Sequence, residues 1–297
     1  MRNDNVGLIG LGAMGLSMGK NLLKNRFNLT VFDIRDEPIR ILEKLGAKIA
    51  ESPKHVGITS SIVLLSLPSS REVEDVVLRA NGLIHSLPKG GIIIDASTIA
   101  PDSVNKLANE CNQKNITFID APVSGGTIGA EKGTLSIMVG GPEDKVDECK
   151  HVLQAIGTNI YHVGNTGAGQ IFKLINNMLV AINLVGISEG FVLAKKTGID
   201  LKKLYEVLKT SAGNSWALEQ KLPKIIESDF EPGFKVWLQY KDLSLAMSLA
   251  SKMNTSLPMT SLAHQMYESA KALGLEDLDH SAVAKIIQRL SLKDMNK

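Results

Sequence analysis

The stretch Val6-Gly7-Leu8-Ile9-Gly10-Leu11-Gly12-Ala13-Met14-Gly15 decides the fold of the first half of this 297-residue chain. An apolar run that predicts a short strand leads directly into a G-x-G-x-x-G motif, and an amphipathic helix is expected from about Met14 to Lys24. Gly10 permits the tight turn, Gly12 lets a pyrophosphate approach the backbone, and Gly15 lets the helix pack closely against the strand. The helix N-terminus would then present free N–H groups to the phosphates.

An acidic residue at the expected distance strengthens this interpretation. The segment Leu29-Thr30-Val31-Phe32 predicts a second strand that ends at Asp33, roughly 20 residues after the glycines, where a carboxylate binds the adenosine ribose. Asp33 favours NAD because it repels the 2′-phosphate of NADP, whereas a guanidinium at Arg35 could hold that phosphate. We therefore predict NAD as the preferred cofactor, with NADP as the alternative. The predicted cofactor-binding residues of this region are Gly10, Leu11, Gly12, Ala13, Met14, Gly15, Asp33, Ile34 and Arg35.

The alternation of strands and helices continues through the first half. Further apolar strands are predicted at 62–67, 91–95, 116–120, 135–141 and 159–163, with helices at 72–79 and 101–113. Unbroken apolar strands separated by helices predict a parallel sheet covered on both faces, with ligands beyond the carboxyl ends of the strands. Three segments then share the rim that faces the cofactor, namely Pro68-Ser69, Ser97-Thr98 and 121–126. We count Leu67, Pro68, Ser69 and Thr98 among the cofactor-binding residues.

The segment Ser124-Gly125-Gly126 is a candidate anion site on this rim. Two glycines after a serine at a strand end can present consecutive backbone N–H groups and a hydroxyl to a carboxylate. An ordinary strand-to-loop turn would have the same composition.

Lys173 is the only formally charged residue between Lys150 and Glu189, and it lies near the start of a long apolar run without proline. The run predicts one long, largely buried helix, from about 169 to 196. A buried lysine is paired, extends to a polar rim, or is used in chemistry. Asn177 lies one turn further on the same face, so the two form a candidate proton-transfer pair. This stretch alone is equally consistent with a structural role, in which the Lys173 side chain extends past Phe172 to reach solvent and takes no part in chemistry.

The second half is predicted to be wholly helical. The chain therefore divides into a Rossmann-type, mostly parallel α/β domain at 1–164 and an all-α domain at 165–297 that the long helix joins to it. One predicted helix, 238–252, carries Lys241, and its expected core stripe is Leu238, Leu245, Leu249 and Met253.

Composition excludes several classes of function. The 33 Lys and Arg residues against 31 Asp and Glu give a formal charge of +2 without a charged block, which offers no case for nucleic acid or a membrane surface. Polar residues in the long helix, such as Asn176 and Asn183, argue against a membrane span. Two cysteines are too few for a disulfide framework, and no His, Cys, Asp or Glu cluster has the spacing of metal ligands, so no metal is predicted. The sequence shows no signal peptide, and we therefore expect a cytoplasmic protein.

Four motifs in this order resemble those of the β-hydroxyacid dehydrogenase family, which includes 3-hydroxyisobutyrate dehydrogenase, tartronate semialdehyde reductase and 2-(hydroxymethyl)glutarate dehydrogenase. The motifs are Gly7 to Gly15, Asp120 to Gly126, Gly167 through Lys173 to Asn177, and Lys241-Asp242-Leu243. The resemblance runs over nearly the whole chain. It implies an NAD(P)-dependent oxidoreductase that interconverts a short β-hydroxyacid and its semialdehyde.

The resemblance also implies roles for individual residues. Lys173 corresponds to the catalytic lysine and Asn177 to its companion, while Ser124, Gly125 and Gly126 correspond to the loop that binds the substrate carboxylate. Thr98 matches a contact of nicotinamide or substrate, and Lys241 a lysine that closes over the cofactor. Asn214 and Trp216 lie in the pocket stretch that differs between subfamilies, and we count them as substrate-binding.

Several substrates satisfy these motifs, among them 3-hydroxyisobutyrate, glycerate or tartronate semialdehyde, and 2-(hydroxymethyl)glutarate. The alternatives are a non-catalytic dinucleotide-binding module and an imine reductase on the same scaffold. Intact Lys173 and Asn177 favour the dehydrogenase, because a pure binder needs no buried amine. A homodimer or homotetramer is expected from the resemblance.

Overall fold

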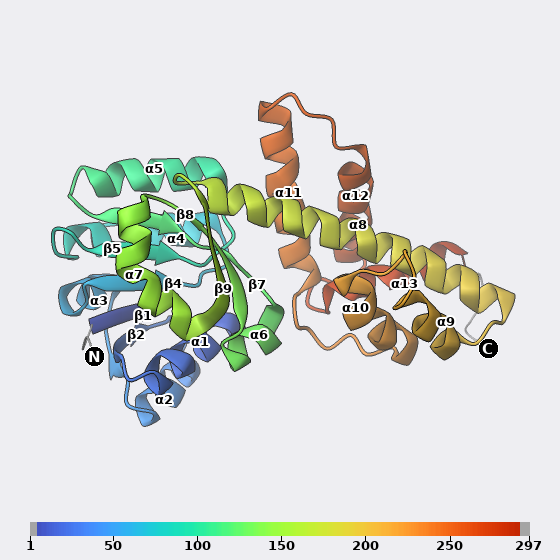
Figure 1. The fold of residues 1–297 in the computed structure, drawn as a ribbon, viewed down its shortest axis with the longest axis horizontal. Coiled ribbons are helices and arrows are strands. Elements are labelled where there is room, and N and C mark those ends of the chain that lie inside the picture. The colour runs from blue at the N-terminus through green and yellow to red at the C-terminus, as the bar shows by residue number, and fades with distance from the viewer. Residues whose placement is uncertain (1–4, 292–297) are drawn as a thin grey trace. The chain divides into compact units, whose positions relative to one another are not determined.

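The computed structural model describes residues 5–291. The chain divides into two compact units, residues 1–173 and residues 174–297. The first unit is built on a sheet, and the described part of the second unit is helical (Figure 1). A mostly parallel sheet followed by a helical region confirms the predicted fold class.

Within the described residues, nine strands form a single sheet in the first unit. They are β1 (Asn5–Ile9), β2 (Asn28–Phe32), β3 (Lys48–Ile49), β4 (Ile62–Leu65), β5 (Ile92–Asp95), β6 (Thr117–Asp120), β7 (Val123–Ser124), β8 (Leu135–Gly140) and β9 (Gly157–Gly164). The order is β3-β2-β1-β4-β5-β6-β8-β7, with β9 beside β8. The strands from β3 to β6 run parallel, whereas β8 runs antiparallel to β6 and β7.

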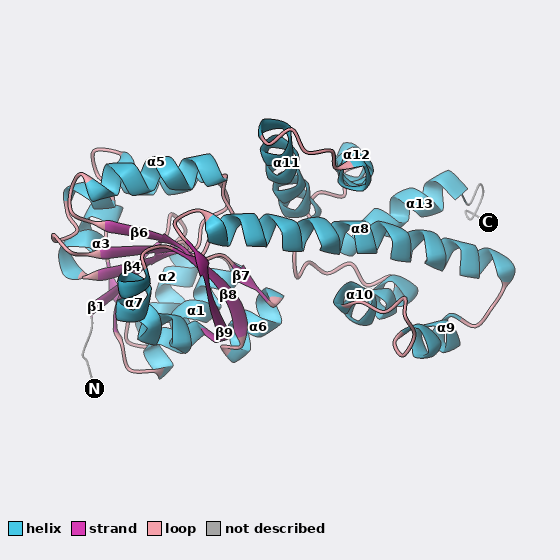
Figure 2. Cartoon of the chain, turned by 45° about the horizontal axis from the view of Figure 1, so that its top comes forward, coloured by secondary structure: helices cyan, strands magenta, loops and turns pink. Residues whose placement is uncertain are grey.

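Helices cover both faces of this sheet (Figure 2). They are α1 (Ala13–Lys24), α2 (Asp36–Lys44), α3 (Pro53–Thr59), α4 (Ser70–Leu78), η1 (Leu83–His85), α5 (Pro101–Asn112), α6 (Gly126–Lys132) and α7 (Glu143–Ile156). One core cluster joins α1, α2, α6 and α7 to the sheet, and another joins α3, α4 and α5 to its other face. Double coverage explains why all four residues of β4 are buried and why its sequence shows no alternation.

The second unit packs around α8 (Ala168–Thr197), which begins in the first unit. The remaining elements are α9 (Leu201–Leu208), α10 (Trp216–Glu227), α11 (Val236–Lys252), α12 (Pro258–Ala272), η2 (His280–Val283) and α13 (Ala284–Ser291). By length and composition α8 could cross a membrane, but Ala181, Leu184 and Phe191 are buried in the core of the second unit. It is therefore a core helix of this unit.

The predicted core stripe of α11 was wrong. The helix buries Val236, Leu243, Ala246 and Ala250, whereas Met253 is 68% exposed. Two polar residues, described below, share the buried face. A stripe drawn through leucine and methionine alone therefore follows the wrong side of the helix.

Candidate active site

The turn after β1 has the shape that a dinucleotide requires. Gly10 has a φ of +89°, which favours glycine, and a Cβ added to Gly15 would lie 2.0 Å from the Gly10 carbonyl oxygen. At Gly12, by contrast, an added Cβ would meet no atom within 4 Å. The start of α1 therefore faces open space, and the residues present fit a pyrophosphate at the helix N-terminus. Leu11 is buried, while Ala13 is exposed and Met14 half-buried.

Asp33 follows β2 and holds its carboxylate against this turn. Its Oδ2 accepts a hydrogen bond from the Leu11 backbone N–H at 2.5 Å, and its Oδ1 lies 3.1 Å from Nε of Arg35. Burial alone would raise the pKa of Asp33, but the hydrogen bonds from Arg35 and Leu11 outweigh it and hold the pKa below the usual value. The carboxylate is thus ionised and fixed beside the glycine turn. Ile34, between the two charged residues, is 92% exposed.

Two loops at the carboxyl ends of β4 and β5 are tied to each other. The Leu67 N–H donates to Oγ of Ser97 at 2.8 Å, and the Ala100 N–H donates to Oγ of Ser70 at 3.0 Å. Ser69 caps α4 by accepting from the Arg71 N–H. The structure therefore brings Leu67, Pro68, Ser69 and Thr98 together on one rim, where the sequence placed them.

The Ser124-Gly125-Gly126 segment adopts a conformation that depends on its glycines. Gly125 and Gly126 have φ values of +127° and +63°, and an added Cβ at Gly126 would meet no atom within 4 Å. Successive backbone N–H groups in such a turn form a concave anion site. Ser124 itself pairs with Ser136 of β8 at the end of β7.

Lys173 lies on the first turns of α8 and is 9% exposed. The start of this helix is bound to the sheet by Asp120, the last residue of β6. Oδ1 of Asp120 accepts from the Gly167 N–H at 2.7 Å, and its Oδ2 accepts from the Gln170 N–H at 2.9 Å. Burial raises the pKa of Asp120 to about 6, against the opposing effect of these N–H groups.

Asn177, one turn after Lys173 on α8, is fixed by three neighbours and is 5% exposed. Its side-chain Nδ2 donates to Oδ2 of Asp242 at 2.5 Å, and its Oδ1 accepts from Asn176 at 3.0 Å. Gln239 donates to its backbone carbonyl at 3.0 Å. Nζ of Lys241 lies 3.2 Å from Oδ1 of Asp242, so Asn177 and Lys241 share one carboxylate.

Asn214 and Trp216 lie at the start of α10. Asn214 uses its amide locally, donating to the Lys209 carbonyl at 2.9 Å and to Oε1 of Glu219 at 2.6 Å. Trp216 opens the helix after the Ser215 cap and is 54% exposed. These contacts do not connect either residue to Asn177 or Lys241.

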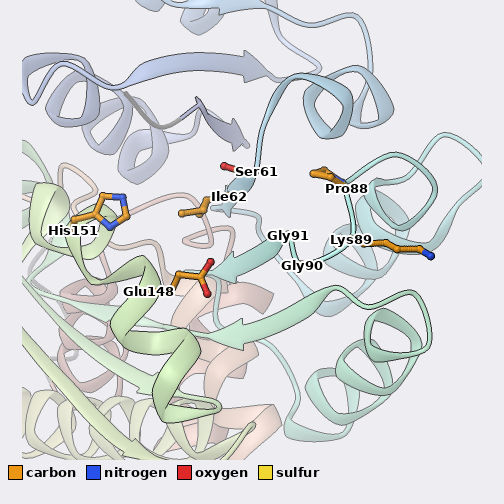
Figure 3. Close-up of a pocket in the computed structure, with 8 residues that line it drawn as sticks. All are labelled: Ser61, Ile62, Pro88, Lys89, Gly90, Gly91, Glu148 and His151. Atoms are coloured by element: carbon orange, nitrogen blue, oxygen red, sulfur yellow. The ribbon is translucent and has the colours of Figure 1, made fainter. Parts of the chain in front are cut away.

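A hollow of about 180 Å³ lies elsewhere in the first unit (Figure 3). It is formed by the amino ends of β4 and β5, with Glu148 and His151 of α7 beside them. The rim described above is formed by the carboxyl ends of the same strands. The hollow is therefore at the opposite edge of the sheet from the candidate site.

The sequence analysis missed four polar residues that bind segments carrying candidate site residues, namely Asp120 and Gln170 in the first unit and Gln239 and Asp242 in the second. Each is at most 1% exposed. Asp120 and Asp242 stand inside the quoted motifs, but nothing in the local pattern assigns them a partner. The available signal was their chemistry, because a carboxylate or amide within an apolar strand or helix face must find a partner.

Two protein families match nearly the whole chain, one in each half. Residues 5–164 match the NAD-binding domain of 6-phosphogluconate dehydrogenase, and residues 167–287 match the NAD-binding family of NADP-dependent 3-hydroxyisobutyrate dehydrogenase. The chain is 41% identical to 2-(hydroxymethyl)glutarate dehydrogenase of Eubacterium barkeri, over 96% of this chain and 95% of that protein. It is 37% identical to NAD-dependent L-serine dehydrogenase of Pseudomonas aeruginosa, over 95% of this chain and 97% of that protein.

A solved structure agrees with these matches. The 3-hydroxyisobutyrate dehydrogenase of Salmonella typhimurium superposes with a TM-score of 0.88 at 29% identity, covering 95% of this chain and 99% of that one. The fold and the dinucleotide turn thus define an NAD(P)-dependent oxidoreductase that acts on a small hydroxyacid. The chain belongs to the 3-hydroxyisobutyrate dehydrogenase, or β-hydroxyacid dehydrogenase, family.

Proposed function

We propose that this enzyme interconverts a short β-hydroxyacid and its semialdehyde, with Lys173 as the general acid and base. The observation that carries the proposal is the burial of Lys173, 9% exposed, on a helix whose first turn is bonded to the Thr98 loop and to the strand that leads to Ser124. A buried amine is costly unless it is paired, extends to a polar rim or is used in chemistry, and its position near the Thr98 loop and Ser124 favours chemistry.

The residues would divide the work as follows. Lys173 takes the proton of the substrate hydroxyl during oxidation and returns it to the forming hydroxyl during reduction. When bound, the nicotinamide accepts or supplies the hydride. The N–H groups of Gly125 and Gly126, with the Ser124 hydroxyl, hold the substrate carboxylate and so fix which face of the reacting carbon is presented.

The amide of Asn177, one turn after Lys173 on the same helix, is proposed to assist this proton transfer. Its Nδ2 is directed to Asp242, and its Oδ1 accepts from Asn176, so the orientation of the amide is set before substrate binds. Lys241, which shares Asp242, is proposed as the cofactor contact, and Asn214 and Trp216 as substrate contacts.

The names of the relatives support one class of substrate. Serine, 3-hydroxyisobutyrate and 2-(hydroxymethyl)glutarate all carry a hydroxymethyl group on the carbon that bears a carboxylate. They differ in the third substituent, which is an ammonium, a methyl or a second carboxylate arm. We propose that the substrate contains this shared unit. The first compounds to test are 2-(hydroxymethyl)glutarate and 3-hydroxyisobutyrate. Glycerate or tartronate semialdehyde, in which the third substituent is a hydroxyl, comes next.

We further propose NAD as the preferred cofactor. The ionised carboxylate of Asp33, bonded to the Leu11 N–H, supports this preference because it would repel a 2′-phosphate. Arg35 is engaged by Asp33, which leaves its guanidinium less available to such a phosphate.

The test is the rate of change of absorbance of the reduced nicotinamide with each of these substrates and with L-serine, using NAD and NADP in turn. Lys173→Ala is expected to lower kcat by on the order of 10²–10⁴-fold while NAD still binds. Lys196→Ala, an exposed lysine further along α8, serves as the control and is expected to retain activity. Unchanged kcat in Lys173→Ala would contradict the proposed mechanism, and NAD binding without turnover of any compound would contradict the proposed substrate class.

A further inference from the structure

The side chain of Gln170 joins the first turn of α8 to the loop after β5. It is fully buried; its Oε1 accepts a hydrogen bond from the Ile99 N–H at 3.1 Å, and its Nε2 donates to the Ser97 carbonyl at 2.8 Å. The two bonds bracket Thr98 on both sides. The loop cannot shift along α8 without leaving these buried polar groups without hydrogen-bond partners, which is unfavourable.

Asp120 holds the same turn from the sheet side. Its two carboxylate oxygens accept from the N–H groups of Gly167 and Gln170, and it stands four residues before Ser124 at the end of β6. The first turn of α8 is also closely packed against the sheet at Gly169. A Cβ added to Gly169 would lie 2.3 Å from the Met138 carbonyl oxygen and 2.8 Å from Oδ2 of Asp120.

The origin of this cap is informative. A helix that needs only a cap takes it from the Ser, Thr, Asp or Asn directly before its first turn. Here Gly167 stands at that place and has no side chain, and the cap comes from Asp120, 47 residues earlier in the chain. Two long-range side-chain contacts therefore fix one helical turn, one to the loop that carries Thr98 and the other to the end of β6, four residues before Ser124.

We propose that Gln170 and Asp120 are positioning residues of the dehydrogenase reaction, which hold the first turn of α8, about one turn before Lys173, to the Thr98 loop and to the end of β6. The proposal rests on the proposed function, because it takes Lys173 as the group that transfers the proton. Lys173 follows Gln170 by three residues, nearly one helical turn, so a shift of the locked turn shifts the amine. A displacement of about 1 Å can cost roughly 10²-fold in rate.

The first experiment removes both hydrogen bonds of Gln170 and keeps a side chain of similar length. Gln170→Met is expected to lower kcat by about 10²-fold, with the Kd for NAD changed by less than about threefold. Gln170→Glu keeps the acceptor for Ile99 but loses the donor to Ser97, and an intermediate loss is expected. Asn21→Leu is the control, since Asn21 is also buried and bonded to a distant carbonyl, that of Ala130 at 2.7 Å.

Double variants separate positioning from plain loss of stability. If Gln170 acts through Lys173, then Gln170→Met added to Lys173→Ala causes little further loss of kcat. The proposal is overturned if Gln170→Met retains kcat within threefold, if Asn21→Leu loses as much at equal stability, or if the two losses multiply. If Lys173→Ala itself keeps full activity, the proposed function has failed instead.

A readout without turnover tests the lock directly. The Ile99 amide, which donates to Gln170, is expected to exchange its hydrogen about tenfold faster in Gln170→Met than in wild type, while the Leu11 amide, which donates to Asp33, is unchanged. The Gly167 amide should respond in the same way to Asp120→Asn. Unaltered protection of Ile99 in Gln170→Met would overturn the proposal whatever the activity.

Discussion

The side-chain amide of Asn177 donates to the carboxylate of Asp242, a residue 65 positions further along the chain, and both side chains are almost completely buried. A carboxylate can only accept, so it fixes which end of the amide faces it. The remaining amide oxygen then points in a defined direction beside the helix that carries Lys173. Asp242 thereby sets the direction of the Asn177 amide.

Asp242→Asn is expected to lower kcat by about tenfold, because an amide at this position no longer forces the Asn177 donor toward it. The Kd for NAD is measured as well, because Lys241, the proposed cofactor contact, shares the Asp242 carboxylate. The measurement is steady-state kinetics together with a binding titration, with Ser248→Ala, an exposed position on the same helix, as the control. A kcat of Asp242→Asn within twofold of wild type would show that the orientation of Asn177 has no kinetic importance.

Gly12 and Gly15 are expected to differ in what an added methyl group disturbs. Gly12→Ala meets no protein atom, so the free energy of unfolding should change by about 1 kcal/mol or less, while NAD binding weakens at least about tenfold. Gly15→Ala collides with the Gly10 carbonyl and should destabilise the protein by about 1–3 kcal/mol. Urea unfolding and NAD titration of both variants make the comparison. Tight NAD binding by Gly12→Ala would place the pyrophosphate elsewhere.

Asp33 is expected to control the choice of cofactor. Asp33→Ala removes the repulsion of a 2′-phosphate and releases the Arg35 guanidinium, so the ratio of kcat/KM for NADP to that for NAD should rise by about 10–100-fold. Arg35→Ala added to this variant should reverse much of the gain. Asp36→Ala, an exposed carboxylate at the start of α2, is the matched control. An unchanged ratio in Asp33→Ala would mean that another residue selects the cofactor.

Asp120 is expected to make the protein less stable as the pH rises. Its folded-state pKa is about 6, above the ordinary 3.8, so the folded protein keeps a proton that the unfolded chain has already lost. The stability gained from this proton is complete below about pH 4 and is lost as the pH passes about 6, for a total of about 3 kcal/mol. Urea unfolding at several pH values should show this decline relative to Asp120→Asn. A constant difference between the two proteins from pH 4 to 6 would contradict it.

Lys221 and Asp279 form a buried ion pair in the second unit with the opposite pH dependence. The distance from Nζ to Oδ2 is 2.9 Å, and although burial alone would raise the pKa of Asp279, His280 and Lys221 lower it to about 2. Lys221→Met is expected to cost about 3–5 kcal/mol near neutral pH, because it leaves a buried carboxylate without its partner. The stabilisation is present above about pH 4 and is lost as the pH falls toward 2, so the difference from wild type should shrink in acid.

The exposed pair of Lys224 and Asp229 provides the comparison for this experiment. Lys224→Met should cost about 1 kcal/mol or less, since exposed pairs contribute little. Equal losses for Lys221→Met and Lys224→Met would mean that burial adds nothing to the first pair.

The sequence predicted what depends on neighbouring residues. Apolar runs such as Ile62 to Leu65 marked the strands, and the glycines from Gly10 to Gly15 marked the dinucleotide turn, because both features are local in the chain. The strands β3 and β7 are two residues long and have too short a pattern to detect. The buried side of α11 was misjudged because the stripe followed Leu238, Leu245 and Leu249, which are only half-buried, while the polar Gln239 and Asp242 lie on the buried face.

The residues that bind segments carrying candidate site residues were out of reach for a different reason. Asp120 and Gln170 act on partners 47 to 73 positions away, and only the folded chain brings these partners together. The sequence could show that a buried carboxylate must have donors, but not which ones. Candidate catalytic residues were thus named from their chemistry, while the groups that orient them required the structure.

The capping of α8 by Asp120 also determines where the chain can be cut. A fragment that ends at Gly164 would retain strand β9 but lose the N–H groups of Gly167 and Gln170, and Asp120 would be left as a buried carboxylate without these donors. A nucleotide-binding fragment that keeps both donors of Asp120 therefore includes the first turns of α8, and the first compact unit ends in these turns, at Lys173. In protein engineering, a domain exchange at this point would move Lys173, the proposed general acid and base, together with the nucleotide-binding domain.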